Sequence, residues 1–170
     1  MVNSLKFICE IIHNTPFWVW VVLVIIVKRG LALLNDSPTN IKRSIIMPLV
    51  FVIWGLDTVV NKFAFPNKLL SFYLFALILG FLFSYLLYMQ RSFYVKKGQL
   101  IQAGSILPLV IMLTNFLVKY SLNVILAIHP TLYIQTNFNI FYGIISGFTV
   151  GLFFGGIYKT FIAKKKLTNS

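Results

Sequence analysis

Acidic residues and cysteine are both scarce in this 170-residue chain. Three acidic residues stand against 15 lysines and arginines, which gives a formal net charge of +12 at pH 7. The single cysteine, Cys9, excludes an internal disulfide and any Cys-x-x-Cys pair, so we do not expect dithiol electron transfer by this chain alone. No basic segment precedes the first apolar run, and no small-residue cleavage site follows a short one. We therefore expect no cleaved signal peptide.

Residue patterns that carry chemistry are also missing. No serine stands in a nucleophile-elbow pattern, and no Gly-rich phosphate loop precedes a lysine. His13 and His129 are two isolated histidines far apart in the sequence, a weak metal signal, so hydrogen bonding at the membrane interface explains them better than a metal does. The sequence therefore predicts no enzyme: no catalytic residues, no metal site and no cofactor.

Apolar residues, in contrast, are abundant. They make up 59% of the chain, only 11% is charged, and the mean hydropathy is +0.88. A soluble domain of this size could not bury so many apolar side chains, so the solvent must be lipid. The basic residues form short clusters between apolar runs and do not alternate with aromatic residues. They indicate membrane topology and lipid headgroup contacts, and no nucleic acid partner.

Five apolar segments approach the length of about 20 residues that crosses a hydrocarbon core about 30 Å thick. We expect an all-α, polytopic membrane protein that forms a single domain over residues 1–170. Leu5, Ile8, Cys9 and Ile12 recur at helical spacing, which predicts a short amphipathic helix over 4–13 on the outer surface. The five transmembrane helices are predicted over 16–34, 44–60, 69–89, 102–122 and 138–162.

The basic residues also predict the orientation, because cytoplasmic loops are enriched in lysine and arginine. Eleven of them fall on one side of the five predicted spans and four on the other. The sequence thus predicts an N-terminus outside and a C-terminus in the cytoplasm. Lys28 and Arg29 lie only about 20 Å along the first helix, so they must snorkel or face a polar partner, and the inner end of that helix stays open. The cytoplasmic group is Lys28, Arg29, Lys42, Arg43, Arg91, Lys96, Lys97, Lys159, Lys164, Lys165 and Lys166; the outer group is Lys6, Lys62, Lys68 and Lys119.

Small residues recur at every fourth position in the last predicted helix, and a weaker version occurs in the third. Such a stripe lets another backbone approach closely, which gains van der Waals contact where no hydrophobic drive acts between helices. We interpret both stripes as a parallel crossing of these two helices; a homodimer face or a narrow solute path are the alternatives. The stripe residues are Gly143, Gly147, Gly151 and Gly155 in the last helix and Ala76, Gly80 and Ser84 in the third.

Asp57 is the only acidic residue within the apolar interior, and a carboxylate there is a functional candidate by default. Lys119 lies at a similar depth in the fourth helix, with Asn115 one turn away. The main interpretation is a fixed ion pair between Asp57 and Lys119. A proton- or ion-coupled site at Asp57, Asn115 and Lys119 is the sharper alternative, and separate snorkelling of the two charges is the third.

The run from His13 to Trp20, with Gly30-Leu31, Arg43 and Pro48, resembles the opening of a family of uncharacterised bacterial inner-membrane proteins. The second half of the chain is similar to the same family in Phe116, Lys119, Tyr120, His129-Pro130, Gly143, Gly147 and Gly151. This resemblance covers most of the chain. It implies the bacterial plasma (inner) membrane as the location and implies no activity.

Together these features predict a non-enzymatic helical membrane module or subunit. Its partners would be the lipid bilayer and either another membrane protein or further copies of the chain. A small transporter or permease is the alternative, with a path lined by Asp57, Asn115, Lys119 and the glycine face. The two differ in the middle of the membrane, where a transporter needs a continuous polar cavity and a module is packed solid.

Overall fold

The computed structural model describes residues 2–96 and 98–168. Residues 1, 97 and 169–170 lie outside this part, among them Lys97 of the basic group and both ends of the predicted domain. For residues 2–5, 7–8, 41–43, 47 and 167–168 only the backbone is described. The elements are α1 (Val2–Asn14), α2 (Phe17–Ala32), β1 (Ser37–Pro38), α3 (Ile41–Lys62), α4 (Pro66–Leu87), β2 (Phe93–Lys96), β3 (Gln99–Gln102), α5 (Leu107–Ile128), the 3-10 helix η1 (Pro130–Ile134) and α6 (Thr136–Thr168).

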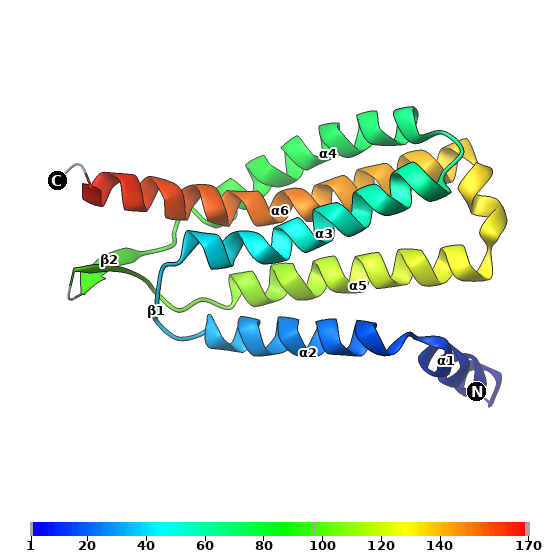
Figure 1. The fold of residues 1–170 in the computed structure, drawn as a ribbon, viewed down its shortest axis with the longest axis horizontal. Helices are drawn as coiled ribbons and strands as arrows, with labels where there is room; N and C mark the ends of the chain where they lie inside the picture. The colour runs from blue at the N-terminus through cyan, green and yellow to red at the C-terminus, as the bar shows by residue number, and fades with distance from the viewer. Residues whose placement is uncertain (1, 97, 169–170) are drawn as a thin grey trace.

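Helices α2 to α6 lie side by side as one bundle, with α1 bent away at one end (Figure 1). Prolines mark several boundaries: Pro16 precedes α2, Pro66 begins α4 and Pro130 begins η1. Proline suits these places because the first helical residues have no intrahelical partner for their amides. Pro48 is the exception, since it lies inside α3. The predicted amphipathic segment 4–13 falls within α1, although the side chains of Leu5 and Ile8 are not described.

Four helices of the described chain, not five, are long and apolar enough to cross a membrane: α3 from Ser44, α4, α5 and α6. The prediction of five spans was wrong at the first helix, 16–34. Helix α2 has 16 residues and spans about 24 Å, short of a core about 30 Å thick. Its last turns also carry Lys28 and Arg29.

Helix α2 nevertheless packs along α5. Near its end, a side chain added at Gly30 would collide with Leu109, close to the start of α5. Just before its start, Thr15 and Tyr120 share a hydrogen bond of 2.6 Å between their hydroxyl groups. Tyr120 lies about 12 Å before the far end of α5. Helix α2 therefore covers one end and the middle of α5 and leaves its last two turns uncovered.

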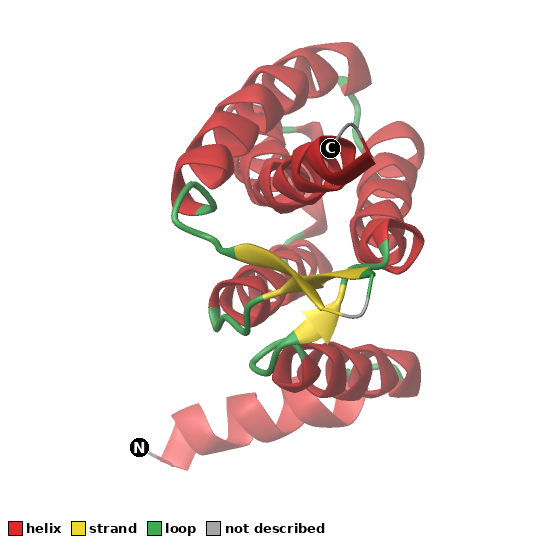
Figure 2. Ribbon diagram, turned by 90° about the vertical axis from the view of Figure 1, so that its left-hand side faces the viewer, coloured by secondary structure: helices red, strands yellow, loops and turns green. Residues whose placement is uncertain are grey.

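A three-stranded antiparallel sheet in the order β1-β3-β2 covers one end of the bundle (Figure 2), so the all-α prediction was incomplete. Ser37 pairs with Gln102, and Phe93 to Lys96 pair with Gln102 to Gln99. The β2–β3 turn contains Gly98, whose φ of 71° favours glycine. Because β3 occupies 99–102, α5 begins at Leu107, five residues after the predicted start at 102.

Asp36 fixes the sheet to the loops around it. The Tyr94 hydroxyl donates to one carboxylate oxygen at 2.5 Å, and the Gly104 amide donates to the other at 2.8 Å. These two donors stabilise the charged form and hold the pKa of Asp36 below its ordinary value. The same bond raises the pKa of Tyr94. Residues from the α2–α3, α4–α5 and β3–α5 connections are thus held together at this end.

Helices α4 and α6 run parallel and approach at the backbone along the predicted stripes. A methyl group at Gly143 would lie 2.7 Å from the carbonyl oxygen of Leu69, and one at Gly147, Gly151 or Gly155 would overlap Tyr73, Leu77 or Ser84 respectively. From α4, a side chain at Gly80 would meet the Phe148 carbonyl. Ala76 is buried, and the Ser84 hydroxyl donates to the Leu152 carbonyl at 2.5 Å. We call this contact the α4–α6 seam.

Replacement of Gly147 or Gly151 by leucine should reduce the folded yield and the Tm of the purified protein. A larger side chain must push the two backbones apart, and overpacking of this kind costs about 1 to 3 kcal/mol or more. Ile144→Leu is the matched control, because Ile144 lies on an exposed face of the same helix. Similar Tm values for all three variants would contradict the role of the seam.

Candidate functional site

Polar side chains gather in the middle of the bundle, where Lys119 is 1% exposed and Asn115 is fully buried. Both come from the face of α5 that is buried in the bundle. The Asn115 amide nitrogen donates to the Thr149 carbonyl of α6 at 2.5 Å and to the Ile111 carbonyl of its own helix at 3.1 Å. Asn115 therefore connects α5 to α6. Inside a bilayer, water would not compete for the hydrogen bond between Asn115 and Thr149.

The Lys119 ammonium group lies beside α3 and α6. A methyl group at Gly55 of α3 would be 3.0 Å from Lys119 Nζ and 3.8 Å from the Tyr73 hydroxyl oxygen. The two polar atoms thus lie near the same point of α3, where glycine leaves room for them. From α6, the ring of Tyr142 lies with its centroid 5.4 Å from Nζ, a distance at which the ring face attracts a cation.

Further hydroxyl groups surround this point. Tyr142 and Ser146 of α6 are fully buried, and Thr58 of α3 is 1% exposed. Both Ser146 and Thr58 lie close to the Tyr142 hydroxyl. Thr58 donates to the Trp54 carbonyl at 3.0 Å, a bond within its own helix. We use the name polar core for Lys119, Asn115, Tyr73, Tyr142, Ser146 and Thr58.

Asp57 does not join the polar core. Its side chain is exposed and accepts a hydrogen bond of 2.7 Å from the Asn61 amide one turn later. Gly55 faces Lys119, and two further residues turn the helix by about 200°, so Asp57 points away from the bundle. Of the three predicted site residues, the structure brings Asn115 and Lys119 together and leaves Asp57 on the outer face of α3.

The sequence reasoning missed Tyr73, Tyr142, Ser146 and Thr58. A signal was present in α6, because Tyr142, Ser146 and Thr149 recur at spacings of four and three and therefore share one face. That face adjoins the glycine stripe of α6. Tyr73 lies three residues before Ala76, on the buried face of α4 that also carries Gly80 and Ser84, so this stripe continued towards the start of the helix would have included it.

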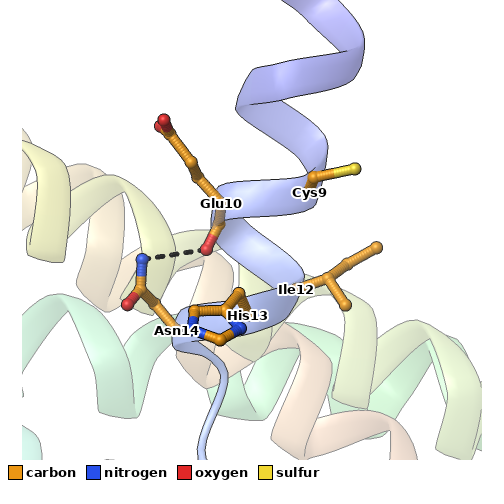
Figure 3. Close-up of a pocket in the computed structure, with 5 residues that line it drawn as sticks. All are labelled: Cys9, Glu10, Ile12, His13 and Asn14. Atoms are coloured by element: carbon orange, nitrogen blue, oxygen red, sulfur yellow. Dashed lines mark hydrogen bonds between the residues drawn. The ribbon is translucent and has the colours of Figure 1, made fainter.

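Two hollows lie on the described surface, outside the polar core. One hollow is lined by Cys9, Glu10, Ile12, His13 and Asn14 of α1, whose side chains diverge around a single helix (Figure 3). Another is lined by Tyr158, Phe161, Ile162, Lys165 and Lys166 near the end of α6. Neither touches the polar core. Over the described residues, no three His, Cys, Asp or Glu side chains gather as a metal site would require.

The separation of Asp57 from Lys119 can be tested with a double-mutant cycle. The effects of Asp57→Asn and Lys119→Met on the free energy of unfolding should add to within about 0.5 kcal/mol, because the two groups share no contact. Asp57→Ala with Asn61→Ala is the matched control, and this hydrogen-bonded pair should show coupling. A coupling energy above about 1 kcal/mol between Asp57 and Lys119 would mean that they interact.

The model of a family described as "Family of unknown function (DUF6622)" matches residues 2–166. No curated protein and no solved structure matches the chain. The resemblance to an uncharacterised family is therefore confirmed. The family description does not state the location in a bacterial membrane that this resemblance implied. Since the match covers almost the whole chain, the protein belongs to the family of unknown function DUF6622.

Proposed function

We infer that this protein is a non-enzymatic module of the bacterial inner membrane, a preformed helical unit that serves as a subunit or scaffold. The observation that carries this function is the α4–α6 seam, where two helices touch backbone to backbone over Leu69 to Ser84 and Gly143 to Gly155. A contact of this kind has no space for a solute to pass. It excludes the glycine face from any transport path and favours a rigid unit.

Packing elsewhere in the bundle supports the same function. Phe51 of α3 stacks on Phe153 of α6 with ring centroids 5.5 Å apart, and Phe63 lies 4.8 Å from the ring of Tyr142. These aromatic side chains fill the space around the polar core from both directions along α3. The partner of such a module would be a second membrane protein or another copy of the chain, bound through the lipid-facing surface.

A small transporter is the second candidate function, and one observation favours it. Lys119 is a buried cation in the middle of a helix that can cross a membrane, and intramembrane charges often mark ion or substrate pathways. Asn115 and the hydroxyl groups of the polar core would line that path. Asp57 would not belong to it, because its side chain faces outward.

Water access to the polar core separates the two functions. Because Cys9 is the only cysteine, Cys9→Ser gives a background free of thiols, to which Ser146→Cys is added. A membrane-impermeant maleimide should leave this introduced thiol unlabelled in the folded protein and label it after denaturation in detergent. Lys68→Cys, at an exposed position, should be labelled in both states. Rapid labelling of folded Ser146→Cys would favour the transporter.

The orientation that we propose places the sheet and the C-terminal end of α6 in the cytoplasm. Its support is the charge distribution, since Lys28, Arg29, Arg91, Lys96 and the lysines at the end of α6 belong to segments at the sheet end of the bundle (Figure 1), and cytoplasmic loops are enriched in such residues. This orientation of α3 to α6 does not depend on whether α2 crosses the membrane. An N-terminus outside requires α2 to cross with them.

A reporter that is active only in the cytoplasm should work when fused after Ser170 and fail when inserted after Ala64, between α3 and α4. The charge difference between the two ends of the bundle is the physical reason. The matched control is a reporter active only outside the cytoplasm at the same two positions, which should give the reverse result. Activity of the cytoplasmic reporter at Ala64 alone would invert the orientation.

A further inference from the structure

The polar core contains an unusual concentration of buried polar atoms without hydrogen-bond partners. Among the described residues, two such side-chain atoms belong to Arg91, and the other five belong to the polar core: Lys119 Nζ, the hydroxyl oxygens of Tyr73 and Tyr142, Ser146 Oγ and Asn115 Oδ1. All five side chains are at most 2% exposed. Each unpaired group in a bilayer costs free energy comparable to a lost hydrogen bond, and an unpaired charge costs much more. Five such atoms in one region call for a shared partner.

No acidic residue of the chain supplies the missing counter-charge. The three acidic residues are Glu10, Asp36 and Asp57, and all of them are exposed. Asp36 is bonded to Tyr94 and Gly104 at the sheet end. Asp57 is bonded to Asn61 on the outer face of α3. The positive charge of Lys119 must therefore be neutralised by loss of a proton or by a group from outside the chain.

Four of the five unpaired groups can donate a hydrogen bond, although the three hydroxyl groups can also accept one. Lys119 carries only donors, and the hydroxyl groups of Tyr73, Tyr142 and Ser146 each offer a proton. Asn115 Oδ1 is an acceptor, but it can satisfy only part of this set. A species that accepts hydrogen bonds and donates none complements such a group of atoms, and one negative charge balances one ammonium. Dense aromatic packing around the core favours a small ion over a polyatomic one.

We propose that the polar core binds a small monovalent anion of the halide class, held by the Lys119 ammonium and the hydroxyl groups of Tyr73 and Tyr142. The anion lies beside Gly55, where Lys119 Nζ and the Tyr73 hydroxyl converge. Ser146 adds a further hydroxyl from α6. The bound ion connects α3, α4, α5 and α6 in the middle of the bundle. This inference adds a ligand to the proposed module and holds whether or not the chain transports anything.

Thermal unfolding of the purified protein in mild detergent tests the proposal. The Tm is measured over increasing sodium chloride and sodium bromide, with sodium gluconate making up a constant ionic strength. Because a ligand that binds only the folded state stabilises it, the Tm should rise by about 5 °C at saturating halide. Gluconate is too large for the site and should have no such effect. Equal Tm values in all three salts would overturn the proposal.

Matched variants locate the effect. Lys119→Met should abolish the difference between chloride and gluconate, whereas Lys62→Met, at an exposed lysine, should preserve it. Tyr73→Phe keeps the ring and removes one donor, so the chloride concentration for half the effect should rise about tenfold. This milder variant decides the matter if Lys119→Met does not fold. An unchanged chloride response in either Lys119→Met or Tyr73→Phe would overturn the assignment of the site.

Discussion

The close approach of α4 and α6 is the contact on which the rest of the bundle depends. Between lipid-immersed helices there is little hydrophobic drive, so the attraction must come from van der Waals contact over a long, shallow surface. Glycine at 143, 147, 151 and 155 provides that surface, and the carbonyl groups of α4 lie against it. The remaining helices pack around this pair: α3 and α5 contact α6, and α2 packs mainly on α5, with Trp18 also in edge-to-face contact with Trp54 of α3.

The centre of the bundle differs from the α4–α6 seam because it contains a buried lysine, Lys119. The seam is held by contacts between the backbones of α4 and α6. In contrast, Lys119, Tyr73 and Tyr142 end in polar atoms that have no hydrogen-bond partner among the described protein groups. Natural proteins tolerate such costs chiefly where a polar group selects a ligand or one arrangement of helices. In this protein the polar core combines such a cost in stability with the anion site that we propose.

Periodicity and composition predicted most helices, because a span of about 20 apolar residues leaves few alternatives to a transmembrane helix. They could not predict that α2 stops at Ala32, since a charged pair within an apolar run is compatible with snorkelling as well as with a helix end. The sheet was missed because its strands have two to four residues and pair over long distances. Depth along a helix placed Asp57 beside Lys119, but depth alone does not determine which way a side chain points.

The pairing of β1 with β3 also bears on biogenesis. The Thr39 side chain and backbone amide both bond the Leu100 carbonyl, 61 residues later in the chain. At roughly 5 to 20 residues per second, a ribosome needs several seconds to make that interval. Helix α2 leaves the ribosome before α5, its packing partner, and before the strand that holds its connection to α3. During those seconds α2 can contact neither α5 nor β3, because both are synthesised after it. The final position of α2 is therefore fixed late, after its first contact with the membrane.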